Sequence, residues 1–122
     1  MAIKIISYNV NGIRAAEKKG LTTWINSKDL DVLCFQEVKA TKDVAPIEAF
    51  EEIGFTNCYW HHAEKKGYSG VAIFSKKAAD HVEIGCGIEK IDREGRIIRA
   101  GFGDWSVLNC YFPSGTLSLI HI

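Results

Sequence analysis

Short runs of β-forming residues constrain this chain more than any other feature of its sequence. Residues 3–8 and 31–35 are dominated by β-branched and aromatic side chains, so each is predicted to form a buried strand. Apolar residues recur at helical spacing in residues 21–26 and 45–53, which are predicted to be helices. Pro46 is tolerated in the first turn of the second helix, and Gly54 lies just past its end.

The apolar period changes to two after residue 55. Further strands are therefore predicted at residues 56–61, 71–75 and 81–84, and a hairpin at residues 97–102 and 105–112 around Gly103 and Asp104. A strand–helix–strand–helix order followed by several strands predicts an α/β (α+β) domain, with a mixed sheet and helices on one of its faces.

Composition narrows the class of protein. The 122 residues suit one domain, since compact domains cluster at roughly 100–150 residues. Lysine plus arginine and aspartate plus glutamate both number 15, which argues against a general electrostatic grip on nucleic acid or membrane but permits a locally positive groove. No apolar run approaches the ~20 residues of a membrane span. The four cysteines form no C-x-x-C pair, which disfavours a zinc knuckle and favours the reducing cytoplasm.

Polar clusters follow three of the predicted strands. Ligands of α/β proteins bind outside the carboxyl ends of strands, and a carboxylate there can hold Mg²⁺ together with waters and phosphate oxygens. An amide can orient that carboxylate, and a tyrosine hydroxyl can donate to a phosphate oxygen. This set predicts part of a site for metal-assisted phosphoester hydrolysis. The clusters are Asn9 with Asn11, Gln36 with Glu37 and Lys39, and Tyr111 with Ser114.

Each of these residues also has an ordinary structural interpretation. Asn9 and Asn11 precede Gly12 and suit a turn, because asparagine tolerates left-handed backbone. Glu37 suits a solvated strand end, and Tyr111 suits a core aromatic whose hydroxyl is satisfied. Taken singly, the structural interpretation is favoured for each residue. Their joint placement at three strand ends raises the weight of the functional one.

Five segments together resemble the exonuclease III branch of the endonuclease/exonuclease/phosphatase superfamily. Their order along the chain matches that family from residue 1 to about residue 116. The strings NVNGIRAA and GYSGVA favour the DNA-repair branch over lipid or inositol phosphatases. The segments are residues 5–14 (IISYNVNGIR), 35–39 (FQEVK), 67–75 (GYSGVAIFS), 94–96 (EGR) and 109–115 (NCYFPSG).

The resemblance implies a four-layer sandwich of two packed mixed sheets flanked by helices. It also implies phosphodiester hydrolysis that depends on Mg²⁺ or Mn²⁺, on duplex DNA with abasic sites or 3′ ends, by a protein that is a monomer when complete. The site residues that it implies are Glu37 and Asn9 at the metal, Tyr111 as the catalytic contact to the scissile phosphate, and Asn11, Arg14 and Lys39 as substrate-binding residues.

Two departures from that family shape further expectations. Its members run to about twice this length, and their Gly-Asp-x-Asn and terminal Ser-Asp-His motifs have no counterpart here. We therefore expect residues 1–116 to be the N-terminal part of one domain and residues 117–122 to be a non-native tail. This part is expected to supply mainly one sheet, leaving residues 32–35 and 71–74 partly uncovered. Alone, it would then be poorly soluble and inactive.

Two other functions stay open at this point. A relative in the same superfamily could act on a lipid or inositol phosphate, and a small α/β binding module would carry no chemistry at all. An assay that compares cleavage of an abasic duplex with cleavage of a phospholipid distinguishes a DNA-repair nuclease from the first alternative. Mg²⁺-independent partner binding that is unaffected by Glu37→Ala would indicate the second.

Overall fold

The computed structural model describes residues 2–113, so Ser114 of the third polar cluster and the predicted tail at residues 117–122 lie outside it. The described residues form two β-sheets. The first sheet has four strands: β1 (Ile5–Asn9), β2 (Val32–Gln36), β3 (Asn57–His61) and β4 (Val71–Ser75). Their order across the sheet is β1-β2-β4-β3, with β1 and β2 parallel and the other neighbouring pairs antiparallel. The second sheet is antiparallel and consists of β5 (His81–Ile84), β6 (Ile97–Phe102) and β7 (Trp105–Cys110).

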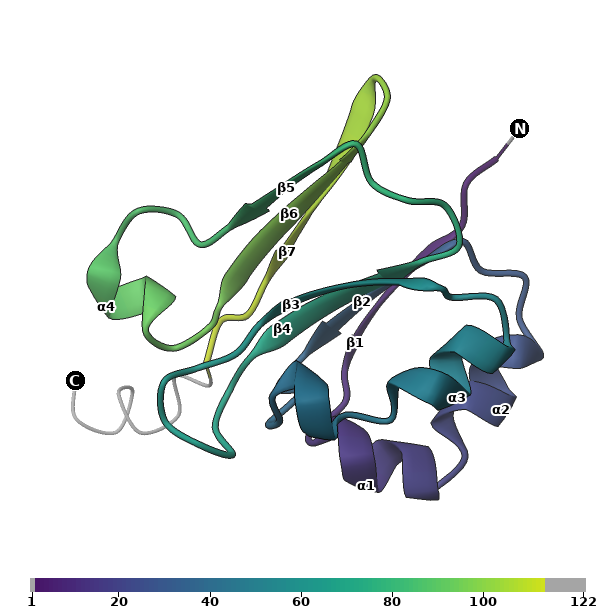
Figure 1. The fold of residues 1–122 in the computed structure, drawn as a ribbon, viewed down its shortest axis with the longest axis horizontal. Coiled ribbons are helices and arrows are strands. Elements are labelled where there is room, and N and C mark those ends of the chain that lie inside the picture. The colour runs from purple at the N-terminus through teal and green to yellow at the C-terminus, as the bar shows by residue number, and fades with distance from the viewer. Residues whose placement is uncertain (1, 114–122) are drawn as a thin grey trace.

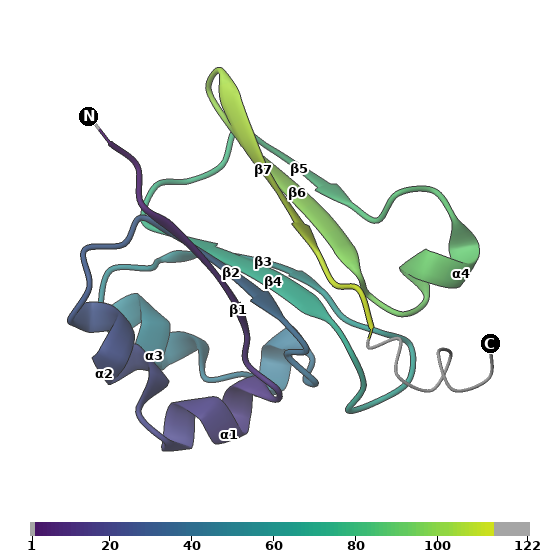
Figure 2. The same cartoon turned by 180° about the vertical axis from the view of Figure 1, so that it is seen from behind.

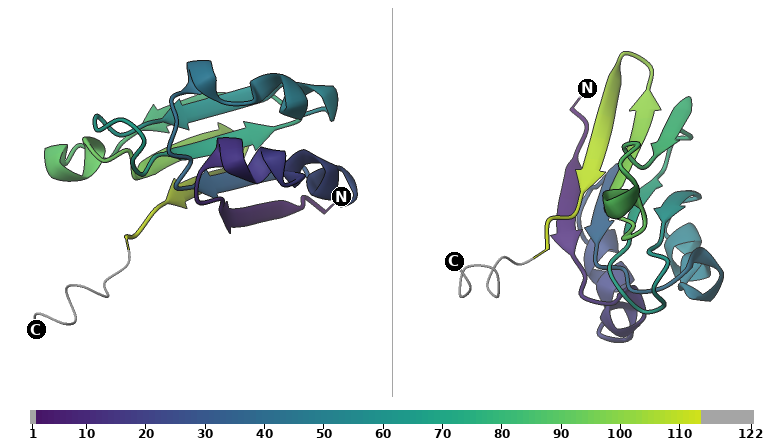
Figure 3. Two further views of the ribbon diagram at one scale, coloured as in Figure 1. Left: turned by 90° about the horizontal axis from the view of Figure 1, so that it is seen from below. Right: turned by 90° about the vertical axis from the view of Figure 1, so that its left-hand side faces the viewer.

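The helices lie mainly on one side of the molecule. The helices within residues 13–52 cover one face of the four-stranded sheet, and the three-stranded sheet packs on its other face (Figure 1). The view from behind shows the same layers (Figure 2), and the left view of Figure 3 looks onto the helical side. No helix within residues 2–113 is long and apolar enough to cross a membrane. The helices are α1 (Ile13–Lys18), α2 (Leu21–Asn26), the 3₁₀ turn η1 (Lys42–Val44), α3 (Ile47–Glu52) and α4 (Glu89–Asp92).

The burial of β2 on both faces of its sheet explains why its sequence is apolar without interruption. Successive side chains of a strand point to opposite faces of the sheet. Leu33 and Phe35 belong to the cluster beneath the helices, whereas Val32 and Cys34 belong to the cluster between the sheets. All four are at most 3% exposed. A strand covered on both faces needs apolar residues at every position, and this continuous apolar run is the pattern that predicted the strand.

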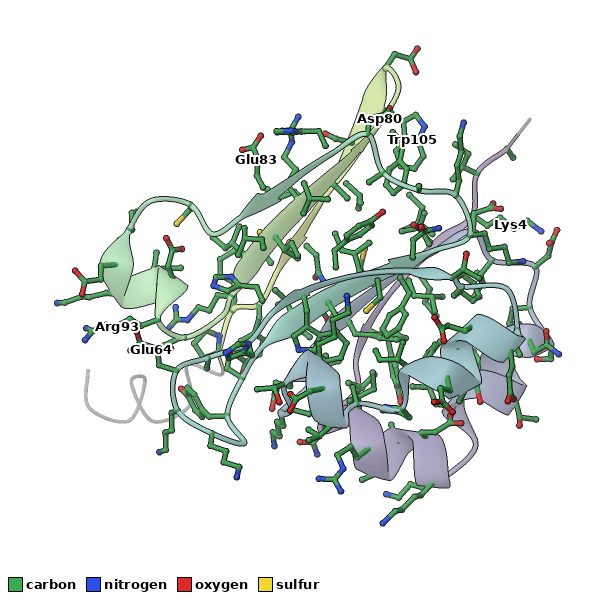
Figure 4. The ribbon with its side chains drawn as sticks, viewed as in Figure 1. Lys4, Glu64, Asp80, Glu83, Arg93 and Trp105 are labelled. Carbon is green, nitrogen blue, oxygen red and sulfur yellow. The ribbon has the colours of Figure 1, made fainter. Side chains whose placement is uncertain are left out.

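The expectation that residues 32–35 and 71–74 would be partly uncovered is wrong. The chain supplies strands to both sheets, and β5 to β7 fold back over β2 and β4. Ile98, Ala100 and Phe102 of β6 provide much of the missing cover. Figure 4 shows side chains filling the space between the sheets, with Trp105 near the turn that joins β6 and β7. The two packed sheets with outer helices confirm the fold class, although the described part of the second sheet is antiparallel, not mixed.

The prediction of a buried strand at residues 3–8 is wrong in its burial. Strand β1 begins at Ile5 and lies at the edge of its sheet, where β2 is the only strand within residues 2–113 that pairs with it. Ile5 and Tyr8 are 44% and 48% exposed. Edge position depends on strand order, which local sequence does not encode. Ile84 and Leu108 are also exposed, so poor solubility stays a prediction that now rests on these exposed apolar side chains.

The helices were predicted unevenly. Helix α2 has the predicted bounds, but α3 begins at Ile47, because Ala45 precedes Pro46 and adopts the extended backbone that proline imposes on its predecessor. Helices α1 and α4 were not predicted. No side chain caps either of them, and Gly12 stands at the N-cap of α1. The usual sequence signal for a helix start is therefore missing.

Candidate active site

Three strand ends converge at one edge of the molecule. Strands β1 and β2 are parallel with Asn9 opposite Gln36, so Asn9 and Glu37 emerge side by side. Strand β7 of the other sheet ends nearby, and Tyr111 follows it. The Tyr111 backbone N–H donates to the Arg96 carbonyl oxygen over 2.8 Å, which continues the pairing with the segment before β6. The topology therefore brings an amide, a carboxylate and a phenol from two sheets to one place.

The polar side chains of the β1 and β2 ends form a linked set. Asn9 Nδ2 donates to Glu37 Oε2 over 2.6 Å, and Asn9 Oδ1 accepts from the Asn11 backbone N–H over 3.0 Å. Lys39 Nζ donates to Asn11 Oδ1 over 2.7 Å and lies 3.6 Å from Glu37 Oε1. The Glu37 carboxylate is thus oriented by an amide on one oxygen and faces an ammonium group on the other.

Unusual backbone geometry is concentrated here. Within the described residues, four non-glycine residues have positive φ angles, and three of them belong to the set just described: Asn11 at 47°, Glu37 at 52° and Lys39 at 52°. The fourth, Ser69 at 50°, accepts a backbone hydrogen bond from Lys39 N over 2.8 Å. Such residues persist only where the surrounding structure holds them, and they concentrate at functional sites.

Backbone hydrogen bonds hold these strained segments in place. Gly12 N donates to the Glu37 carbonyl over 2.7 Å, and Val38 N donates to the Gly70 carbonyl over 3.2 Å. Gly70 has a φ of +92°, and a Cβ there would lie 2.8 Å from Val38 Cγ2, so this close approach requires glycine. The residues that follow β1 and β2 and those that precede β4 are therefore fixed against one another.

The electrostatics of the site hold Glu37 ionised and Tyr111 neutral. The Asn9 hydrogen bond is the main cause that lowers the pKa of Glu37, and the Tyr111 hydroxyl and the Lys39 charge lower it further against the opposing effect of burial. Burial raises the pKa of the Tyr111 phenol, and the charge of Glu37 raises it further. At neutral pH the site presents a carboxylate beside a phenol that keeps its proton.

Asn9→Ala tests the cause of the low Glu37 pKa. Removing the amide should raise the pKa of Glu37 toward its usual range, as measured by carbon NMR titration of the metal-free protein. A carboxyl group with a lowered native pKa stabilises the fold above its unfolded pKa, and this stabilisation is lost as the pH falls through the native pKa. The stability difference from the native protein should therefore shrink in acid. Asn26→Ala, at an exposed position of α2, is the control that should leave the Glu37 titration unchanged.

The predicted substrate-binding residues lie in this set or beside it. Arg14 and Lys39 line one cavity of about 460 Å³, which extends to Lys65 and Lys66. Asn11 contacts Lys39 and lines a neighbouring cavity of about 510 Å³ beneath α1 and α2. The structure therefore brings Arg14, Lys39 and Asn11 to the border of the Glu37 cluster, where local positive charge accompanies a chain of zero net charge.

Gln36 and Asn109 lie beside the site and were not assigned a role from the sequence. Asn109 is 2% exposed, and its amide contacts Gln36 of the other sheet over 2.8 Å. The sequence did contain a signal for the burial of Asn109, because this residue shares the inward face of β7 with Trp105 and Val107. A polar residue at an inward strand position needs buried hydrogen-bond partners.

Comparison with known proteins identifies the family. A family model described as Endonuclease/Exonuclease/phosphatase family matches residues 6–119. The chain belongs to this family. It is 37% identical over 121 residues to the DNA repair nuclease APEX1 of Danio rerio, and 36% identical over 121 residues to an exodeoxyribonuclease of Bacillus subtilis. Each alignment covers 98% of this chain, but only 39% and 46% of the two relatives.

A solved structure supports the same assignment. An AP endonuclease from Archaeoglobus fulgidus superposes with a TM-score of 0.80 at 33% identity, over 93% of this chain and 42% of that one. The resemblance to the exonuclease III branch is thereby confirmed. This family member spans less than half the length of the relatives to which it is similar.

The donor set at Glu37 fits a divalent cation only in part. Mg²⁺ is commonly held by one or two carboxylates, with waters and substrate phosphates completing its shell. Glu37 supplies one carboxylate, and the Asn9 amide holds it in orientation. Within residues 2–113, no group of three histidine, cysteine, aspartate or glutamate side chains gathers at one place. A cation here would therefore take Glu37 and the Asn9 oxygen from the described residues.

Proposed function

We propose that this chain is part of a metal-dependent phosphodiester hydrolase that acts on DNA in repair, at abasic sites and 3′ ends of duplexes. The observation that carries the proposal is the convergence of Asn9, Glu37 and Tyr111 from three strand ends. Family membership and the similarity to a DNA repair nuclease, an exodeoxyribonuclease and an AP endonuclease support it. The proposed domain comprises residues 1–116 and further chain, since this chain covers only 39% and 46% of the two relatives.

In this proposal each residue has a distinct task. Glu37, with Asn9 beside it, would hold Mg²⁺ or Mn²⁺. When bound, the ion would stabilise the negative charge on the phosphate oxygens. The protonated Tyr111 hydroxyl donates a hydrogen bond to a non-bridging oxygen of the scissile phosphate. Arg14 and Lys39 contact the DNA backbone, and Asn11 orients Lys39. The four cysteines are all unpaired, which supports a reducing compartment such as the cytoplasm.

The function is tested with the complete gene product that contains this chain. A duplex with one abasic site and a duplex with a recessed 3′ end are incubated with Mg²⁺, with Mn²⁺ or with a chelator. Cleavage only in the presence of metal is the expected result. Cleavage of a phospholipid or an inositol phosphate in place of DNA would instead identify the other branch of the superfamily. Absence of any cleavage would indicate a binding module and overturn the proposal.

Tyr111→Phe tests the phenol. The variant loses only the hydroxyl, so kcat should fall by about 100-fold while KM for DNA changes little, as expected for a donor that acts mainly in the transition state. Tyr59→Phe is the matched control, since the Tyr59 hydroxyl accepts from Ala79 N between the sheets, away from Glu37. Equal kcat values for native protein and Tyr111→Phe would remove Tyr111 from the site.

A further inference from the structure

One of the buried polar side chains between the two sheets is an asparagine that meets three partners. Asn109 Nδ2 donates to the Phe35 carbonyl over 3.0 Å and to the Ala72 carbonyl over 2.8 Å. Asn109 Oδ1 accepts from Gln36 Nε2 over 2.8 Å. Both hydrogens and the oxygen of the amide are therefore used, and only an amide in this orientation satisfies all three partners. Asn109 belongs to β7, whereas its partners belong to β2 and β4 of the other sheet.

Gln36 extends the contact to a third strand. Its Nε2 also lies 3.1 Å from Ser7 Oγ of β1. One continuous hydrogen-bonded network therefore links β1, β2 and β7. We call Ser7, Gln36 and Asn109 the inter-sheet bridge.

Each member of the inter-sheet bridge stands close before a residue of the proposed site. Ser7 lies two residues before Asn9, Gln36 directly precedes Glu37, and Asn109 lies two residues before Tyr111. Residues two apart on a strand share a face, so a contact at one position fixes the direction in which the next same-face residue projects. Elsewhere the packing of the two sheets is mainly apolar, apart from a hydrogen bond of 2.9 Å between His61 Nδ1 of β3 and the Ile97 carbonyl of β6.

We propose that Gln36 and Asn109 are positioning residues of the hydrolase, whose inter-sheet bridge sets the separation between the Glu37 carboxylate and the Tyr111 hydroxyl. The inference rests on the proposed function. Glu37 comes from one sheet and Tyr111 from the other, so any sliding of the sheets changes this separation directly. Misplacement of a reacting group by about 1 Å can cost about 100-fold in rate. Buried hydrogen bonds restrict such sliding in a way that apolar contacts do not.

Two variants break the inter-sheet bridge from opposite sides. Asn109→Leu removes all three hydrogen bonds at similar volume, and Gln36→Met keeps chain length but removes the amide. Val32→Ala is the control, because Val32 packs between the same sheets at the other end of β2 from Gln36. It lowers stability without touching the site, so it reports what a purely structural loss would do.

The experiment measures three quantities on the complete gene product: melting temperature, kcat and KM on an abasic duplex, and the fluorine NMR signal of Tyr111. The signal is recorded on metal-free protein labelled with 3-fluorotyrosine and is assigned by its loss in Tyr111→Phe. We expect both bridge variants to lower kcat at least tenfold, to leave KM within about twofold and to shift the Tyr111 signal. Val32→Ala should lower the melting temperature while kcat and the signal stay unchanged.

The other outcomes are equally informative. Native kcat and an unmoved Tyr111 signal in both bridge variants would overturn the positioning role and leave the proposed function intact. The same would follow if Val32→Ala lowered kcat as much as they do, or if neither bridge variant folded, since the role would then be structural. A native protein that cleaves no DNA would overturn the proposed function, and the positioning role with it.

Discussion

Replacing Glu37 with glutamine should lower kcat/KM for duplex DNA by at least about 100-fold. The variant keeps the length of the side chain and an oxygen that accepts from Asn9 Nδ2, so it removes the charge and little else. Loss of a residue that only supports a metal ligand commonly costs 10–100-fold, and loss of the carboxylate itself should exceed that. Titration with Mn²⁺ should show weaker metal binding together with the lower rate.

Glu83→Gln is the matched control for Glu37→Gln. Glu83, in β5, is also a carboxylate with a lowered pKa, caused first by its hydrogen bond with His81 and then by the charge of Arg99. It lies on the outer side of the second sheet, where the labelled side chain points away from the other sheet (Figure 4). The control should bind Mn²⁺ and cleave DNA as the native protein does. If Glu37→Gln did the same, the metal site would have to lie elsewhere.

Phe74→Ala should cost about 3–5 kcal/mol of unfolding free energy, the usual range for truncating a fully buried phenylalanine. Phe74 is 0% exposed and stands at the centre of an aromatic cluster beneath the helices. Its ring centroid lies 4.2 Å from that of Phe50, 5.7 Å from that of Phe35 and 5.9 Å from that of Trp60. The truncation would leave a cavity that three rings cannot close. Urea unfolding gives the free energy of each variant.

Phe112→Ala makes the same chemical change at a position that is 80% exposed. A surface substitution of this kind should alter the unfolding free energy by no more than about 0.5 kcal/mol. The comparison also examines whether the described core unfolds cooperatively. Equal losses in the two variants would mean that the aromatic cluster is not packed in solution, in line with the poor solubility expected from exposed apolar side chains.

Local patterns predicted the elements that tertiary contacts do not alter. The bounds of β4 and α2 were predicted correctly, because apolar residues fill one and recur at helical spacing in the other. The hairpin of β6 and β7 also formed at its predicted turn. Helix α1 escaped prediction because the residues before it, Asn11 and Gly12, are typical of a turn. They do make the turn, and the helix follows directly, since backbone bonds to Glu37 and Val38 hold its first residues.

The candidate site likewise has features that local sequence predicted and features that only distant contacts explain. Strand-end position was sufficient to single out Asn9, Glu37, Lys39 and Tyr111 as residues that could meet. The left-handed backbone at Glu37 and Lys39 carries no such local signal, because neither residue type favours it. It is imposed by hydrogen bonds to segments about 25 and 30 positions away in the chain, at Gly12 and Ser69.

The sequence by itself determined which segments become strands and that their polar ends carry acid, amide and phenol groups, since periodicity and residue type are local properties. Only the tertiary structure decided that β1 lies at an edge, that the chain builds parts of two sheets, and that Asn109 joins them. These outcomes depend on pairing between residues as far apart as Phe35 and Asn109, separated by 74 positions. Such pairing follows from the packing free energy of the whole domain, which no short stretch of sequence contains.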